Sequence, residues 1–95
     1  MSDDVIARTL AISEAIADFI VDDLDWDGTK AALLGASPVD LPAVLDSADL
    51  LELAGYLEDQ FGVVIEDEEI VAENFTTVEQ LAGFIVTKQM QQGDP

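Results

Sequence analysis

The 95-residue chain contains no cysteine and no histidine. Without cysteine it can form neither a disulfide nor a thiolate nucleophile nor a thiolate metal site. Without histidine it lacks the side chain that most often acts as a general base near neutral pH. A catalyst built from carboxylates alone, for example Asp22 with Asp25, is the enzymatic alternative, but the sequence indicates no pocket around them. We therefore predict that the chain is not an enzyme.

Positive charge is almost as scarce. Arg8, Lys30 and Lys88 are the only basic residues against 21 acidic ones, and the formal net charge is −18. Such a surface repels nucleic acid and anionic membranes. It is instead attracted to basic patches on partner proteins. The charge balance therefore predicts protein partners, with no nucleic-acid or membrane partner.

Long apolar runs are also missing. The longest, such as residues 81–86, are far too short to cross a bilayer, and the acidic residues 1–4 lack the features of a secretory signal. Hydrophobic residues nevertheless make up 49% of the chain, which is enough for one folded core. We expect a single cytoplasmic, monomeric domain over residues 1–95, with frayed tails at residues 1–3 and about 89–95.

Apolar residues recur at helical spacing in three segments. The first runs from Asp4 to about Val21, the second from Asp46 or Ser47 to Phe61, and the last begins after Thr76 and Thr77. A short helix should open in the acidic group at residues 66–69 and continue through Val71. Capping residues support these bounds. Asp46 is placed as an N-cap, Gly62 as a C-terminal stop, and Thr77 with Gln80, or Thr76 with Glu79, fits a capping box.

A long connection joins the first two long helices. It runs from Trp26 to about Asp46, and its glycines and prolines argue against a regular helix through the segment. Its apolar residues should nevertheless lie over the bundle: Leu33, Leu34, Val39, Leu41, Val44 and Leu45. The predicted fold class is all-α, a small bundle of three longer helices and one short helix with a long loop between the first and second.

Residues 44–53, Val-Leu-Asp-Ser-Ala-Asp-Leu-Leu-Glu-Leu, resemble the acyl and peptidyl carrier protein signature. In that signature two apolar residues precede Asp-Ser and a hydrophobic helix follows. The resemblance continues in register through residues 57–63 and 65–69, and then through Asn74–Phe75 and Thr77–Val78. Upstream, residues 19–21 and 26–28 resemble discrete, stand-alone carriers of polyketide or nonribosomal peptide biosynthesis.

The resemblance implies that Ser47 carries a 4'-phosphopantetheine arm, taken from coenzyme A, whose thiol holds an acyl or aminoacyl group as a thioester. A serine at a helix N-terminus also suits a phosphate on physical grounds, because unpaired N–H groups and the positive end of the dipole face it. The alternatives are a fatty-acid-type carrier and an acidic helical adaptor that carries no cofactor.

The resemblance also implies partners. These are a phosphopantetheinyl transferase, a loading ligase, adenylation enzyme or acyltransferase, and downstream synthases or tailoring enzymes with basic docking patches. The predicted contacts are Asp46, Ala48, Asp49 and Glu52 on the helix that Ser47 opens. Two residues depart from the family pattern. Ala48 replaces a usual Leu or Met, and Ala43 replaces a common Gly. We expect these departures to affect which partners bind more than whether Ser47 is modified.

Residues 23–28, Asp-Leu-Asp-Trp-Asp-Gly, match the first half of a calcium-binding loop. The bidentate carboxylate needed at the twelfth position falls on Leu34, and Gly35 and Pro38 oppose the helix that should follow. We therefore predict no metal site. Tyr56 and Trp26 are predicted to be partly buried beside the core rather than to stack on a ligand.

Overall fold

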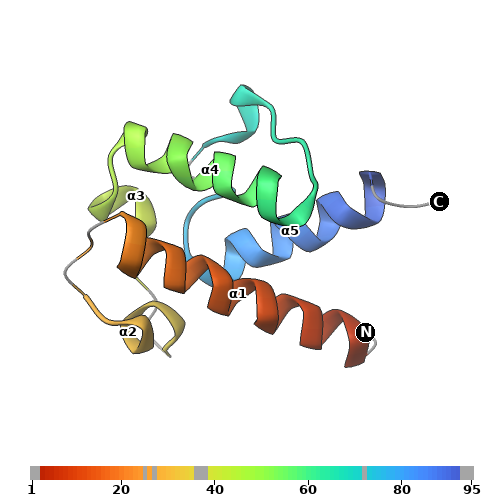
Figure 1. Ribbon diagram of the computed structural model, residues 1–95, viewed down its shortest axis with the longest axis horizontal. Helices are drawn as coiled ribbons and strands as arrows, with labels where there is room; N and C mark the ends of the chain where they lie inside the picture. Colours follow the sequence, from red (N-terminus) through yellow and green to blue (C-terminus); the bar gives the residue numbers. More distant parts are fainter. Residues whose placement is uncertain (1–2, 25, 27, 36–38, 72, 93–95) are drawn as a thin grey trace.

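The computed structural model describes residues 3–24, 26, 28–35, 39–71 and 73–92. Within this part of the chain all regular elements are helices. The long ones are α1 (Asp3–Asp23), α4 (Ser47–Phe61) and α5 (Val78–Gln92), and Figure 1 shows them around one core. The 3-10 helix η1 (Asp67–Glu69) lies between α4 and α5. The predicted all-α fold with three longer helices is confirmed, whereas the short helix expected through Val71 ends at Glu69.

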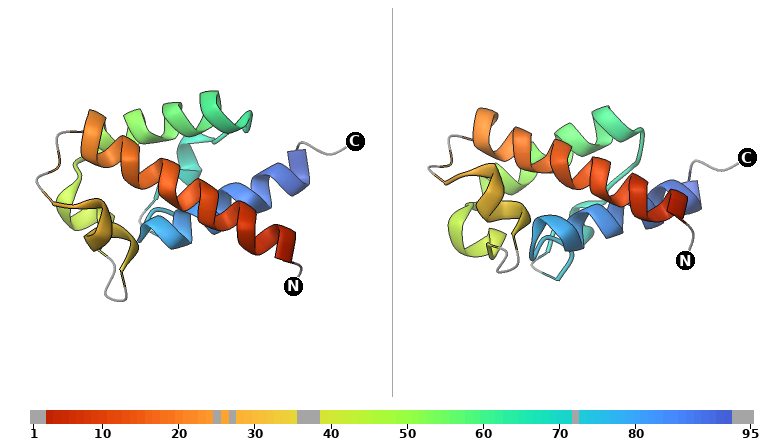
Figure 2. Two further views of the ribbon diagram at one scale, coloured as in Figure 1. Left: turned by 60° about the horizontal axis from the view of Figure 1, so that its bottom comes forward. Right: turned by 90° about the horizontal axis from the view of Figure 1, so that it is seen from below.

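The core is formed by the apolar stripes that the sequence pattern predicts. Helix α1 packs along α5, and α4 closes the bundle (Figures 1 and 2). The stripes consist of residues four positions apart that are at most 2% exposed: Ile12, Ile16 and Ile20 on α1, Leu53 and Leu57 on α4, and Leu81 and Ile85 on α5. Burying one such side chain stabilises the fold by about 1.5–3 kcal/mol.

The connection between α1 and α4 is more regular than expected, because it contains the short helices α2 (Lys30–Leu34) and α3 (Leu41–Val44). The Thr29 hydroxyl accepts a hydrogen bond from the Ala32 N–H at 3.2 Å and caps α2. Pro42 lies in the first turn of α3, where a missing N–H costs nothing. Pro42 is therefore compatible with a short helix here.

The predicted cover of the bundle is confirmed in part. Leu33, Leu41 and Leu45 of the connection are buried, and Val39 is half-buried. The expectation is wrong for Leu34 and Val44, which are 39% and 45% exposed. Each lies on a helix of only five or four residues, so one side of the helix meets the core and the other faces solvent.

Helix α5 continues to residue 92, and Gln89 within it is half-buried. The stretch expected to fray from about residue 89 thus continues α5 as far as residue 92, and residues 93–95 lie outside the described part. Asp3 likewise belongs to α1 rather than to a tail. Along the described ranges, no helix combines the length and apolar character required to cross a bilayer.

Candidate functional site

Ser47 is exposed and is the first residue of α4. Its position is fixed by α3, which directly precedes it. The buried Leu41 donates its backbone N–H to the Thr76 carbonyl at 2.8 Å, and Leu45 donates to the Leu41 carbonyl at 2.8 Å. These bonds fasten the start of α4 close to the start of α5, so Ser47 projects from a rigid corner of the bundle.

A reciprocal capping box surrounds Ser47. The Asp46 carboxylate accepts the Asp49 N–H at 2.9 Å, and the Asp49 carboxylate accepts the Asp46 N–H at 3.4 Å. The predicted N-cap role of Asp46 is confirmed, whereas the return bond from Asp49 was not predicted. Both acids therefore stabilise the helix end on which Ser47 stands.

Ser47 borders an open depression of about 500 Å³ between α4 and the η1 segment. The remaining lining residues are Leu50, Leu51, Asp67 and Ile70. Leu51 is 55% exposed, while Leu50 and Ile70 are half-buried. Ser47 thus lies beside a surface that is mainly apolar.

The predicted partner contacts lie together on the first two turns of α4. Asp46, Ala48 and Glu52 are exposed and Asp49 is half-buried. Glu52 also borders a second, acidic depression of about 680 Å³ between α1 and α4, lined further by Phe19, Asp22, Asp23, Gly55, Tyr56 and Asp59. The side of α4 that faces α1 is therefore strongly negative.

Tyr56 lies at the base of this acidic depression. Its ring stacks on Phe19 with centroids 4.2 Å apart, and both side chains pack against the core. Burial raises the pKa of the Tyr56 phenol, and the negative charges of Asp18 and Asp23 raise it further. Trp26 is also half-buried against the core, so the predicted partial burial of both aromatic residues is confirmed.

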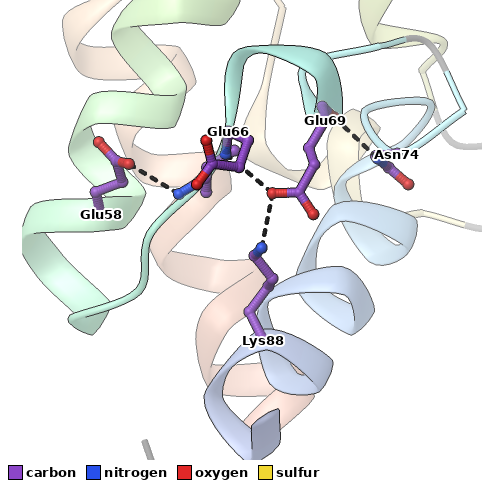
Figure 3. Close-up of polar contacts among 6 residues, drawn as sticks. Glu58, Glu66, Glu69, Asn74 and Lys88 are labelled. Carbon is purple, nitrogen blue, oxygen red and sulfur yellow. Dashed lines mark hydrogen bonds and ion pairs between the residues drawn. The ribbon is translucent and has the colours of Figure 1, made fainter. Parts of the chain in front are cut away.

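The segment that forms the far wall of the Ser47 depression is held by polar contacts (Figure 3). The Glu58 carboxylate on α4 accepts the Ile65 N–H at 2.8 Å. One carboxylate oxygen of Glu69 accepts both the Glu66 N–H, at 2.9 Å, and the Lys88 ammonium, at 2.7 Å. These bonds connect the segment after α4 to α4 itself and to α5.

Comparison with known proteins assigns the family. Residues 45–85 match the family model described as a phosphopantetheine attachment site. The chain is 38% identical over 78 residues to an acyl carrier protein of Rubrobacter xylanophilus, an alignment that covers 82% of this chain and 91% of that protein. It is 37% identical over 75 residues to an acyl carrier protein of Petrotoga mobilis, covering 79% and 84%.

The chain belongs to the acyl carrier protein family. Members are non-catalytic carriers with covalently bound 4'-phosphopantetheine, and they interact with a phosphopantetheinyl transferase and with acyl-handling enzymes. The predicted carrier family, its cofactor and the absence of enzymatic activity are thus confirmed. No solved structure matches the chain.

Four residues at the depression of this carrier were not predicted as site residues: Leu50, Leu51, Asp67 and Ile70. The sequence could have indicated Leu51, because this residue is apolar yet lies outside the inward stripe of α4 that contains Leu50 and Leu53. Asp67 and Ile70 are far from Ser47 in the sequence, and only the path of the chain after α4 brings them beside it.

Two of the three acidic residues in the calcium-loop pattern, Asp25 and Asp27, lie outside the described residues. The carboxylate pair of Asp22 and Asp25 is untested for the same reason. Among the residues that are described, no group of three or more acidic side chains is arranged to hold a metal ion.

Proposed function

We propose that this carrier holds an acyl or aminoacyl group through a 4'-phosphopantetheine arm on Ser47 and delivers it to successive partner enzymes. The observation that carries the proposal is the position of Ser47, exposed at the start of α4 beside an apolar depression. Ser47 is also the only serine within residues 45–85, the range that matches the attachment-site family model.

The residues around Ser47 fit such an arm. Ser47 is the first residue of α4, and the positive end of a helix dipole favours a phosphate at such a position. The exposed hydroxyl and the small Ala48 leave room for a modifying enzyme. Leu50, Leu51 and Ile70 offer apolar surface to a carried chain. When bound, the arm supplies the thiol that holds the cargo as a thioester.

The chain's own contribution is to anchor and present the arm. The chain contains no histidine, so we infer that the transferase activates the Ser47 hydroxyl. Tethering makes each delivery an intramolecular event at high effective concentration, which is what a carrier adds to the chemistry of its partners.

Intact mass measures the modification directly. The unmodified protein is incubated with coenzyme A and a broad-specificity phosphopantetheinyl transferase, and we expect one phosphopantetheine adduct. Ser47→Ala should take up none, because no hydroxyl remains at the start of α4. Ser13→Ala is the matched control, since the buried Ser13 hydroxyl donates to the Thr9 carbonyl at 2.9 Å and should not be modified.

Two results contradict the assignment. If Ser47→Ala gains the same adduct as the wild-type chain, Ser47 is not the attachment residue. If no variant and no wild-type chain gains mass, the unmodified helical adaptor becomes the better description.

Two classes of cargo have support. The resemblance of residues 19–21 and 26–28 favours a polyketide or nonribosomal peptide carrier, and Ala48 next to Ser47 suggests unusual partners. The relatives in Rubrobacter and Petrotoga are named acyl carrier protein without further qualification, which favours a fatty-acid-type carrier at least as strongly. The mass of the loaded arm on protein isolated from its native host decides between them.

We further propose that partners dock on Asp46, Ala48, Asp49 and Glu52. This surface is negative and adjoins Ser47, so it complements the basic patches expected on a transferase, on a loading ligase, adenylation enzyme or acyltransferase, and on later synthases or tailoring enzymes. The exposed Leu51 and Val44, which lie within four residues of Ser47 in the sequence, add apolar contact area. Charge would then orient the partner, and the apolar residues would hold it.

A further inference from the structure

Lys88 on α5 is a buried cation, with only 7% of its surface exposed. Lysine is almost never this buried unless it is paired. Its ammonium group donates to the Glu69 carboxylate at 2.7 Å and lies 5.6 Å from the centre of the Phe84 ring. Lys88 is the buried partner, with 8% of its side chain exposed, whereas Glu69 keeps 28% of its side chain exposed. The contact therefore links a buried position on α5 to the partly exposed segment after α4.

Glu69 connects Lys88 to both sides of the η1 segment (Figure 3). The carboxylate oxygen that binds Lys88 also accepts the Glu66 N–H at 2.9 Å, just before η1. The Glu69 backbone carbonyl accepts the Asn74 side-chain N–H at 2.9 Å, after η1. One residue thus ties together both ends of the segment, and Lys88 fastens that residue to α5.

Core packing holds the same segment only weakly. None of the three η1 residues is buried, and Ile70, which follows them, is half-buried. Yet Asp67 and Ile70 form the wall of the depression opposite Ser47. The polar contacts of Glu69 and the bond from Ile65 to Glu58 add to the packing of Ile70 against the core in holding that wall.

We propose that Lys88 is a positioning residue, whose ion pair with Glu69 holds the η1 wall of the Ser47 depression in the shape that receives a carried apolar chain. Lys88 acts through Glu69 and does not itself line the depression. The part of this inference that concerns the carried chain rests on the proposed function. The part that concerns the wall does not.

Amide hydrogen exchange on the unmodified protein tests the wall. In Lys88→Met, which keeps an unbranched side chain without its charge, the amides of Glu69, Ile70 and Phe75 should exchange about tenfold faster or more. These amides donate to the carbonyls of Glu66, Asp67 and Val71. Amides in the middle of α1 and α4 should keep their wild-type rates, and Lys88→Arg should restore slow exchange at the wall.

Lys30→Met is the matched control, because it removes the same charge from an ion pair with Asp18 that is largely exposed and lines no part of the depression. It should leave exchange at the wall unchanged. The inference is overturned if Lys88→Met leaves wall exchange at the wild-type rate. It is equally overturned if exchange rises to the same extent throughout α1 and α4, since Lys88 would then support only global stability.

A dye on the arm tests the link to the carried chain. The chain has no cysteine, so the arm thiol is its only thiol, and it adds across the C=C bond of a solvatochromic maleimide to form a thioether. In the wild-type protein the emission maximum of the dye should lie at shorter wavelength than that of the same dye on free pantetheine. Lys88→Met should shift the maximum most of the way back to the free-pantetheine value, whereas Lys88→Arg and Lys30→Met should not shift it.

The two measurements separate the possible failures. Wild-type protein that takes up no arm contradicts the proposed function, while the exchange result still tests the wall. An arm that is installed, but whose dye emits identically in wild type and Lys88→Met, contradicts the inference while leaving the proposed function intact.

Discussion

Asp46 and Asp49 show how a single turn can serve two purposes. Their carboxylates and backbone N–H groups form reciprocal hydrogen bonds across the first turn of α4. These acids therefore provide acceptors for N–H groups at the helix end before any partner binds. Both also belong to the proposed docking surface. A partner that contacts them meets carboxylates already held in place, and therefore loses less side-chain entropy on binding.

Asp46→Ala should reduce the free energy of unfolding by about 1 kcal/mol, because the Asp49 N–H loses its acceptor. Urea denaturation measures the change. Asp59→Ala is the control, since it removes the same charge from an exposed position near the other end of α4, where a negative charge opposes the helix dipole. Equal losses in the two variants would show that the cap contributes nothing beyond charge.

At the scale of whole elements, α4 is defined at both ends by residues that the sequence displays. Asp46 opens it, and Gly62 closes it in the left-handed conformation, with φ 66° and its N–H donating to the Glu58 carbonyl at 3.0 Å. Glycine adopts this conformation without the steric cost that a Cβ brings. Because α4 ends there, the chain turns back toward Ser47 and forms the wall of the depression.

Two glycine substitutions in or next to α4 should have opposite effects. A Cβ at either Gly62 or Gly55 would meet nothing within 4 Å, so neither change creates a clash. Gly62→Ala should destabilise by about 1 kcal/mol because its φ is positive. Gly55→Ala should stabilise by about 0.5–1 kcal/mol because glycine is a poor residue inside a helix. Thermal unfolding compares them, and a shift of the same sign in both would contradict the argument.

The sequence predicts elements well where periodicity and caps coincide. Helices α1, α4 and α5 are long enough for an apolar stripe to repeat, and Asp46, Gly62 and Thr77 mark their ends, with the Gln80 N–H bonded to the Thr77 hydroxyl at 3.1 Å. Helices α2 and α3 are too short for an apolar stripe to repeat. Tertiary contacts, such as the hydrogen bond from the Leu41 N–H to the Thr76 carbonyl, therefore determine where they form.

The same reasoning explains what was found and missed at the candidate site. Ser47 and its acidic neighbours belong to one continuous stretch of sequence, so a sequence motif can identify them. The residues that hold the wall of the depression are not continuous in the sequence. Lys88 and Glu69 are 19 residues apart and belong to different elements, so no local spacing relates them. Only the packing of α5 against the segment after α4 brings them together.

At the scale of the whole molecule, almost all charged side chains are negative. The structure measures 39 × 28 × 21 Å and carries a net charge of −18. All three cations are already paired inside the chain: Arg8 with Asp4, Lys30 with Asp18, and Lys88 with Glu69. The remaining acidic side chains repel one another, and salt screens this repulsion effectively over the distances that separate them.

Salt should therefore change folding and partner binding in opposite directions. Raising sodium chloride from about 0.01 M to about 1 M shortens the Debye length from about 30 Å to about 3 Å. The urea midpoint of the isolated carrier should rise because self-repulsion weakens, while the KM of the transferase for the carrier should rise because attraction weakens. A transferase KM that does not change with salt would contradict docking through the acidic surface of α4.

The pairing of Lys88 has one further chemical consequence. A thioester reacts readily with a free amine, so a protein that carries one for long periods is at risk of acylating itself. Among its side chains, this chain offers two lysine amines and no cysteine thiol or histidine imidazole to receive the acyl group. Lys30 is engaged by Asp18 at 3.1 Å, and Lys88 is buried against Glu69. The ion pair with Glu69 thus also keeps the Lys88 amine buried and engaged, which makes it a poor acceptor for the acyl group and leaves that group to the partner enzymes.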